Sequence, residues 1–177
     1  MEKKARREEI YQGKVIHVVR DDVLLDDGKM AIREVVKHKG GVCVALKDPD
    51  DGKFFMVRQY RYCFKRKMLE FCAGKLEKDE EPLAAIKREC EEELGYQAEK
   101  IQYLGEMIPT CGYSTEIIYL YYAEMGEAVG QHLDDDESIE IRKYSAKEIK
   151  DMVRNGTIKD GKTICLLYHV MMEGLDD

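Results

Sequence analysis

The sequence predicts a mixed α/β protein in which a sheet lies between helices. Strand-like stretches with alternating or continuous apolar residues fill 11–62 and return between 98 and 145. Helical spacing of apolar residues appears in the middle of the chain, at 82–94, and again near its end. Strands and helices mixed in this order form layered folds in which helices cover a sheet.

Composition limits the class of protein further. The 177 residues suggest one domain with a small appendage, and 44% hydrophobic residues suffice for a core. A net charge of −7 argues against a nucleic-acid partner. No apolar run approaches a membrane span, and residues 1–11 lack the apolar core of a signal peptide. We therefore expect a cytoplasmic protein that binds neither nucleic acid nor membrane.

The first 40 residues are expected to form short β elements. Apolar and polar residues alternate over 11–38, and Asp27-Gly28 is a hairpin signal, whereas 1–7 is a charged tail. This segment is too short for a core of its own, so it must pack on the main domain or on a second subunit. The predicted organisation is an N-terminal β segment at 1–40 and a main domain at 41–177.

Strands and loops account for most of the main domain. A buried strand at 40–48 turns at 49–52 and returns at 53–62, where Arg58 and Arg61 point to opposite faces. Each arginine either pairs with an acid or binds a phosphate or ribose. The stretch 68–74 leads into the central helix. Further segments follow: a loop and strand at 98–110, a loop at 111–116, a strand at 117–125, an acidic loop at 126–138 and a strand at 139–145.

Two helices are expected at the C-terminal end. Ser145 is a good N-cap for a helix at 146–156, and Glu148 completes a capping box. The segment 157–174 contains a final helix whose Ile164, Leu167, Tyr168 and Met171 have core spacing.

The six cysteines, at 43, 63, 72, 90, 111 and 165, show no CxxC pair and no zinc spacing. They are expected to be reduced and mostly buried thiols. Cys111 is not expected to act as a nucleophile, because no histidine stands at a recognisable partner spacing.

The central helix carries the acidic residues. Pro82 suits its first turn and Gly95 its end, with Leu83, Ile86, Cys90 and Leu94 as an apolar stripe. Glu89, Glu92 and Glu93 share the adjacent face, where the small Ala85 leaves room. Like charges at this spacing repel one another, so the cluster is either a solvated surface or a site for a hard cation such as Mg²⁺ or Mn²⁺.

The full spacing decides between these alternatives, because it resembles the signature of the Nudix hydrolases. Every defined position of this signature, the Nudix box, is present, although aliphatic residues are more usual than Cys90 and Tyr96. These positions are Gly74, Glu80, Arg88, Glu89, Cys90, Glu92, Glu93, Gly95 and Tyr96. The stretches REVVKHKGGV, VRQYRY, MLEFCAG and DDDESIEIRKYS resemble the ADP-ribose pyrophosphatase branch of that family, and this likeness extends from about Tyr11 to Met171.

The resemblance implies an α/β/α sandwich and a homodimer in which the N-terminal β segment contributes to the partner's substrate site. It implies Mg²⁺-dependent hydrolysis, with Mn²⁺ as an alternative metal, of the pyrophosphate bond of a nucleoside diphosphate sugar. The first candidate is ADP-ribose, which would give AMP and ribose 5-phosphate.

Site residues follow from the same resemblance. The metal ligands would be Glu89, Glu92, Glu93, Glu137 and the carbonyl of Ala73, with Arg88 orienting the glutamates and Glu80 in support. A carboxylate takes the proton from water, and Asp135 and Glu137 fall on the positions that supply it. Substrate contacts would come from Arg61, Arg33, Glu34, His38, Glu116 and the loop that contains Gly112.

Two departures leave the substrate open. The branch has Pro-Gly where this chain has Cys111-Gly112, and a proline where this chain has Cys72. GDP-mannose is therefore an alternative substrate, and a non-catalytic module that binds nucleotide sugars is an alternative function, although such modules tend to lose box glutamates. Dinucleoside polyphosphates or oxidised nucleotides are a third possibility, against which the long N-terminal β segment argues.

Overall fold

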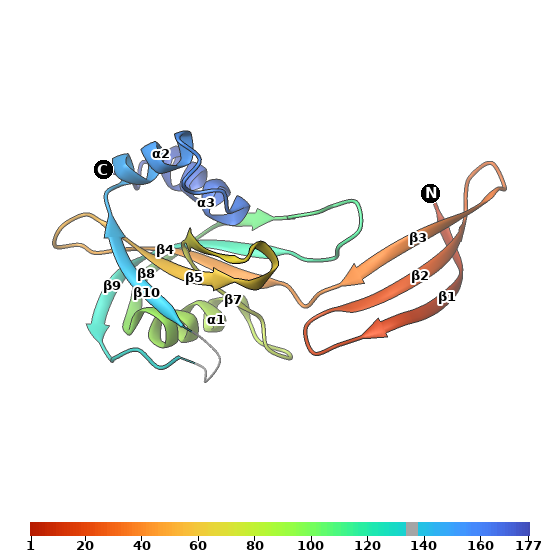
Figure 1. The fold of residues 1–177 in the computed structure, drawn as a ribbon, viewed down its shortest axis with the longest axis horizontal. Helices are drawn as coiled ribbons and strands as arrows, with labels where there is room; N and C mark the ends of the chain where they lie inside the picture. The colour runs from red at the N-terminus through yellow and green to blue at the C-terminus, as the bar shows by residue number, and fades with distance from the viewer. Residues whose placement is uncertain (134–137) are drawn as a thin grey trace. The chain divides into compact units, whose positions relative to one another are not determined.

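The computed structural model describes residues 1–133 and 138–177 and divides into two compact units (Figure 1). The N-terminal unit comprises Met1–Gly40 and Ile108–Ile117, and the main unit comprises Gly41–Met107 and Ile118–Asp177. No helix in the described part of the chain is both long and apolar enough to cross a membrane.

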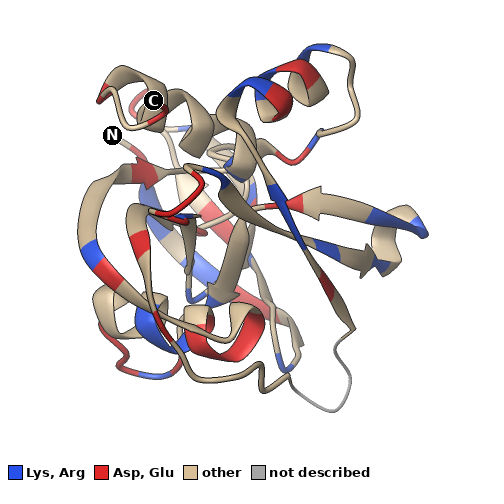
Figure 2. Cartoon of the chain, turned by 90° about the vertical axis from the view of Figure 1, so that its left-hand side faces the viewer, with Lys and Arg blue, Asp and Glu red and all other residues tan. Residues whose placement is uncertain are grey.

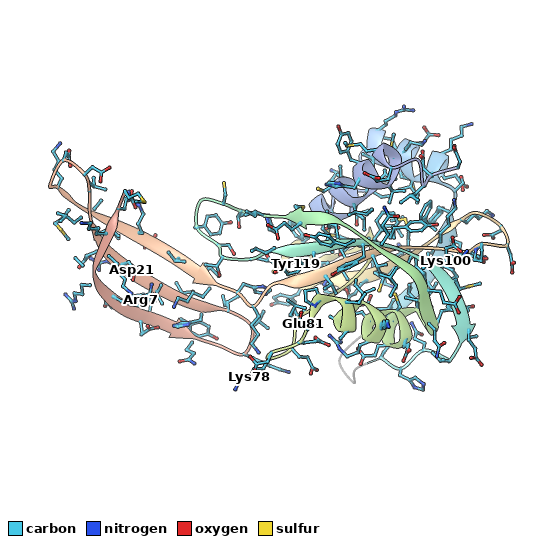
Figure 3. The ribbon with its side chains drawn as sticks, turned by 180° about the vertical axis from the view of Figure 1, so that it is seen from behind. Arg7, Asp21, Lys78, Glu81, Lys100 and Tyr119 are labelled. Carbon is cyan, nitrogen blue, oxygen red and sulfur yellow. The ribbon has the colours of Figure 1, made fainter. Side chains whose placement is uncertain are left out.

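The N-terminal unit is a three-stranded antiparallel sheet in the order β1 (Lys3–Gln12), β2 (His17–Leu24) and β3 (Met30–Lys37). Gly28 adopts a φ of 81° in the turn between β2 and β3, which confirms the predicted hairpin. The prediction of a charged tail at 1–7 was wrong, because β1 begins at Lys3. Two Arg7 N–H groups donate to the Asp21 carboxylate at 2.7 and 2.6 Å across the β1–β2 ladder (Figure 3), so charged side chains stabilise this strand.

The loop 108–117 completes the N-terminal unit. Val36 on β3 donates its N–H to the Tyr113 carbonyl at 2.7 Å and accepts from the Thr115 N–H at 3.0 Å. This segment is distant in sequence from β3, and these backbone bonds fix it beside that strand.

The main unit contains a seven-stranded mixed sheet. Its main path is β10-β5-β4-β9-β8, with β6 paired to β5 and β7 paired to β4. Among the described strands of this sheet, β4 and β9 form the only parallel pair, in the register Gly41↔Ile118 to Lys47↔Glu124. The strand bounds are β4 (Gly41–Lys47), β5 (Phe54–Arg61), β6 (Arg66–Glu70), β7 (Cys72–Lys75), β8 (Tyr96–Met107), β9 (Ile118–Ala128) and β10 (Ile139–Tyr144), and a short 3₁₀ turn, Tyr62–Phe64, links β5 to β6.

Helices cover both faces of this sheet (Figure 1). The helix α1 (Pro82–Glu89) continues into a π-helical turn (Cys90–Leu94) on one face, and α2 (Ala146–Arg154) and α3 (Gly161–Met172) lie on the other. Alternate β4 residues enter two separate cores: Val44 packs in the cluster with Ile86 of α1, and Cys43 packs in the cluster with Leu166 of α3. The predicted α/β/α sandwich is confirmed.

The predicted start of α2 is confirmed. The Ser145 hydroxyl accepts the Glu148 N–H at 3.3 Å, and the Glu148 carboxylate accepts the Ser145 N–H at 2.8 Å. These reciprocal bonds satisfy two backbone donors that a helix start leaves unpaired.

The predicted core face of α3 was partly wrong. Thr163, Leu166, Leu167 and Val170 are buried, whereas Tyr168 is 61% exposed. Ile164 and Met171 are also among the exposed apolar residues. Most of this helix is apolar, so spacing alone permits more than one stripe, and contact with the sheet selects the one that is buried.

All six cysteines are free thiols, as predicted, but only Cys43, Cys72 and Cys90 are buried. Burial raises the pKa of the Cys43 thiol well above its ordinary value, so this group remains protonated. Cys63 and Cys111 are exposed.

Candidate active site

The helix that carries the acidic cluster begins and ends where the sequence predicts. Pro82 is its first residue, and Gly95 closes it in the left-handed conformation with a φ of 76°. Ile86, Cys90 and Leu94 are buried, but Leu83 is 47% exposed, so that part of the predicted stripe was wrong. Buried positions recur as neighbouring pairs at 85/86, 89/90 and 93/94. At this spacing Glu89 and Glu93 lie on the same helix face as the small Ala85, and Leu83 lies at the edge of the buried face.

Arg88 lies among three of the box carboxylates. Its Nε and Nη2 donate to Glu80 at 2.9 and 3.0 Å, and its Nη1 donates to Glu89 and Glu92 at 2.8 Å each. Nη2 also donates to the Lys75 carbonyl at 3.2 Å. The hydrogen bond from Arg88 lowers the pKa of Glu80, so this carboxylate remains ionised at neutral pH.

The cluster keeps an excess of negative charge despite Arg88. Glu80, Glu89, Glu92 and Glu93 set four carboxylates against one guanidinium, a formal charge of −3. Figure 2 shows acidic positions gathered along this helix beside basic ones. Holding this charge together in a partly buried place costs free energy unless a cation is bound.

Two of the glutamates pack closely against the backbone of β7. A Cβ placed on Gly74 would lie 1.7 Å from Oε1 of Glu89, so the carboxylate occupies the space of the missing side chain. The Ala73 N–H donates to Oε2 of Glu93 at 3.3 Å. Glu89 and Glu93 are only 8% and 4% exposed. The structure therefore brings two buried carboxylates to the segment that contains the Ala73 carbonyl, which is another of the predicted ligands.

This donor set suits a hard divalent cation, which binds one or two carboxylates and takes its other ligands from water or substrate phosphates. Across 1–133 and 138–177, no three acidic, histidine or cysteine side chains are arranged to enclose a metal by themselves. Asp135 and Glu137, the two predicted loop carboxylates, lie outside the described residues.

The segment 129–132 contacts the end of the carboxylate helix, which is α1 together with the π-helical turn that follows it. The N–H groups of Val129 and Gly130 donate to the Gly95 carbonyl at 2.9 and 3.1 Å, and the His132 N–H donates to the Glu92 carbonyl at 3.0 Å. The Gln131 side-chain amide donates to the Glu93 carbonyl at 2.7 Å. Sequence reasoning missed Gln131, because nothing in its local sequence indicates which distant carbonyl it binds.

Arg61 belongs to a buried ionic network. It donates two hydrogen bonds to the Glu70 carboxylate, at 2.8 and 2.7 Å, and these raise the pKa of the guanidinium. Lys162, at the start of α3, binds Glu70 as well and lies 2.9 Å from Asp160. Sequence reasoning also missed Glu70 and Lys162. Arg58, the other arginine of β5, pairs with Glu140 at 3.6 Å.

The remaining predicted substrate residues lie in the N-terminal unit. The structure brings His38 and Glu116 together, with 3.5 Å between Nδ1 and Oε1. Arg33 instead pairs with Glu2, and this hydrogen bond raises the pKa of Arg33. Glu34 stands opposite Arg20 in the β2–β3 ladder. A Cβ on Gly112 would meet no atom within 4 Å, so its loop presents open space.

The fold is a sheet between helices, and Arg88 binds glutamates of the helix that ends at Gly95. These two features define the class to which this chain belongs. The chain is a member of the Nudix family: the NUDIX domain model matches residues 37–167.

Comparison with known proteins supports this membership. The chain is 36% identical to an ADP-ribose pyrophosphatase from Bacillus subtilis, with 97% of this chain and 94% of the relative aligned. It is 34% identical to a methanol dehydrogenase activator from Bacillus methanolicus, with 97% and 94% aligned. It is 30% identical to a GDP-mannose pyrophosphatase from Cronobacter sakazakii, with 92% and 91% aligned. The solved structure of an ADP compounds hydrolase has the same fold, with a TM-score of 0.85 at 16% identity and 97% and 93% of the two chains covered.

Proposed function

We propose that this Nudix protein is an enzyme that hydrolyses the pyrophosphate bond of a nucleoside diphosphate sugar, with ADP-ribose as the first candidate. The observation that carries the proposal is the complete carboxylate cluster, in which Arg88 binds Glu80, Glu89 and Glu92. The relatives named as ADP-ribose and GDP-mannose pyrophosphatases support this substrate class. A module that only binds nucleotide sugars would have no need of every box glutamate.

The residues of the cluster have separate tasks in this proposal. Glu89, Glu93 and the Ala73 carbonyl would hold a divalent cation, with Glu92 beside them. When bound, Mg²⁺ or Mn²⁺ neutralises the diphosphate and lowers the pKa of the attacking water. Arg88 keeps Glu89 and Glu92 in fixed positions through charge-assisted hydrogen bonds. Such prior positioning reduces the reorganisation that the reaction requires.

A carboxylate must also accept the proton of the attacking water. The family resemblance favours Asp135 or Glu137. Glu137→Gln and Asp135→Asn should be assayed separately at saturating Mg²⁺, and the correct one should lower kcat strongly with KM nearly unchanged. If both variants keep full kcat, Glu92 becomes the leading candidate.

The choice of substrate is tested by a Mg²⁺-dependent screen over nucleoside diphosphate sugars and dinucleotides. The proposal expects ADP-ribose to give the highest kcat/KM, with AMP and ribose 5-phosphate as products. A preference for GDP-mannose would keep the reaction and change the base and the sugar. Tight binding of nucleotide sugars without turnover would contradict the proposal and favour a binding module.

The proposal includes a homodimer in the cytoplasm. The N-terminal sheet exposes apolar side chains, among them Ile10, Leu24, Met30 and Ile32, which a second subunit could cover. In such a dimer Arg33, Glu34, His38, Glu116 and the Gly112 loop would contact substrate. Six free thiols agree with a reducing compartment.

A further inference from the structure

We propose that Gln131 is a positioning residue that holds the metal-binding end of the carboxylate helix. Its Nε2 donates to the backbone carbonyl of Glu93 at 2.7 Å. Glu93 is one of the two deeply buried carboxylates of the site, so Gln131 acts on the backbone that carries it. The inference rests on the proposed function and adds a residue from outside the box.

The carbonyls at the end of the carboxylate helix receive donors from outside the helix. The last carbonyls of a helix have no partner within the helix and need donors from elsewhere. Here the Gly95 N–H reaches back to the carbonyls of Cys90 and Glu91, and the segment 129–132 supplies donors to Glu92, Glu93 and Gly95. Of these outside donors, Gln131 provides the side chain and its neighbours provide backbone N–H groups.

The last turn of the helix has an unusual shape. Cys90–Leu94 is π-helical, and the Gly95 N–H bonds to the Cys90 carbonyl five residues earlier. π-helical turns are rare and are frequently found at functional sites. Hydrogen bonds from outside the helix to the carbonyls of this turn stabilise the geometry in which they form. The Gln131 bond to Glu93 and the His132 bond to Glu92 are located where they can do so.

Gly95 lies directly against the segment that carries Gln131. A Cβ at this position would lie 2.8 Å from the Gln131 nitrogen and 2.9 Å from the Gly130 carbonyl carbon. The last box glycine therefore permits two things, the left-handed helix end and the close approach of the segment that carries Gln131. The approach is built into the backbone and does not depend on one flexible side chain.

Loss of the Gln131 amide should weaken metal binding. Groups that orient metal ligands without touching the metal commonly change metal affinity or activity by about 10- to 100-fold when they are removed. Without the Gln131 amide, the Glu93 carbonyl loses its donor and the π turn loses one of its supports. The carboxylate of Glu93 would then be held less firmly beside the Ala73 backbone.

The experiment measures Mn²⁺ binding directly, by electron paramagnetic resonance of free Mn²⁺, on the full-length wild type and Gln131→Met. Methionine matches the length of glutamine and has no N–H donor. The matched control is Gln102→Met, at an exposed position on β8. We expect Gln131→Met to bind Mn²⁺ about tenfold more weakly and Gln102→Met to bind it like the wild type.

Thermal unfolding, recorded in parallel without metal, separates positioning from a loss of folded protein. A purely structural role would lower the melting temperature and leave the Mn²⁺ dissociation constant of the folded variant unchanged, which would overturn the inference. Gln131→Asn shortens the side chain by one methylene and serves if the methionine variant does not fold. Wild-type Mn²⁺ affinity in the asparagine variant would likewise overturn it. If the wild type binds Mn²⁺ but hydrolyses no nucleotide sugar, the proposed function fails while the comparison of affinities still tests Gln131.

Discussion

Gly74 is a glycine because a carboxylate occupies the volume that its side chain would fill. The Glu89 carboxylate would lie within 2.4 Å of a Cβ there, with both oxygens and the carbon involved. The glycine at the start of the signature therefore permits a close contact between β7 and the carboxylate helix. Because Glu89 cannot keep its position beside a larger residue, Gly74 and Glu89 form one feature of the site.

Gly74→Ala tests this contact. We expect the variant to displace Glu89 and to lose at least about 90% of Mn²⁺ affinity and of turnover, as for other losses of ligand orientation. Isothermal titration with Mn²⁺ and a kcat measurement provide the readouts. Gly161→Ala is the matched control, because a Cβ there meets nothing within 4 Å. Wild-type Mn²⁺ affinity in Gly74→Ala would show that metal binding does not depend on the position of the Glu89 carboxylate beside Gly74.

Glu93→Gln tests the other buried carboxylate. The substitution keeps the shape and removes one charge from a cluster of like charges, so stability should not fall. Turnover should fall by about 100-fold or more, because the amide is a poor ligand for Mg²⁺. The assay is kcat at saturating Mg²⁺, with Glu91→Gln on the same turn as the control. Near-wild-type activity of Glu93→Gln would show that the proposed ligand set is wrong.

For single residues, the sequence predicted those contacts that join residues close together in the chain. Arg88 and Glu92 are neighbours on one helix, so their contact follows from helical periodicity. Gln131 and Lys162 contact groups far away in the chain, and no local rule relates them to Glu93 or Glu70. Such residues become identifiable only when tertiary contacts are known.

The start of α3 is attached to the sheet by ionic groups as well as by apolar packing. Lys162 and Arg61 both bind Glu70, which is 1% exposed, and the Thr163 hydroxyl accepts the Phe71 N–H at 2.9 Å. Breaking a buried pair by removing one partner leaves the other charge uncompensated and is strongly destabilising. The network therefore fixes where α3 sits on the sheet.

Lys162→Met should lower the free energy of unfolding by about 3 kcal/mol at pH 7. This value is near the lower end of the range for broken buried ion pairs, because Arg61 still binds Glu70 in the variant. Urea denaturation measures the change, with the exposed Lys159→Met as control. A loss no larger than that of the control would show that Lys162 contributes no net stability.

The same network predicts a pH dependence. Burial raises the pKa of Glu70, but hydrogen bonds and charges from Arg61 and Lys162 outweigh it, and the net pKa lies below the ordinary value of 4.5. A carboxyl whose pKa is lower in the folded state stabilises the protein above its unfolded pKa, and the contribution is lost as pH falls through the folded pKa. Stability should therefore decline below about pH 4.5, and Glu70→Gln should show a shallower decline in urea titrations between pH 6 and pH 3. If stability declines equally steeply with falling pH in the wild type and in Glu70→Gln, groups other than Glu70 cause the loss of stability in acid.

Elements were predictable where a strong local pattern existed. The capping box at Ser145 and the hairpin at Gly28 depend on a few adjacent residues, and both occur where expected. The start of β1 was mistaken for a tail because six of the ten residues of this strand are charged and all ten are exposed. Cross-strand pairs such as Arg7 with Asp21 stabilise it, and these depend on the partner strand.

The N-terminal sheet leaves much of its surface exposed. Val19 and Val23 are buried, but every residue of β1 is exposed. We predict a homodimer at micromolar concentration, observed as a dimer mass in analytical ultracentrifugation. A stable and active monomer would contradict this. Deleting residues 1–38 should abolish dimerisation and raise KM for the substrate, because the proposed site takes residues from this unit.

The parallel pairing of β4 with β9 has a consequence for the time course of folding. Four strands and the carboxylate helix lie between these two partners in the sequence, so the chain must close a long loop before they meet. Contacts between distant segments slow folding, and a chain still being synthesised exposes its unpaired strands. As the protein emerges from the ribosome, β4 lacks its parallel neighbour until β9 appears, and α3 follows later still. A ribosome-bound chain that ends before Ile118 should therefore resist compaction and be cleaved readily by protease, even though it already contains the entire carboxylate helix.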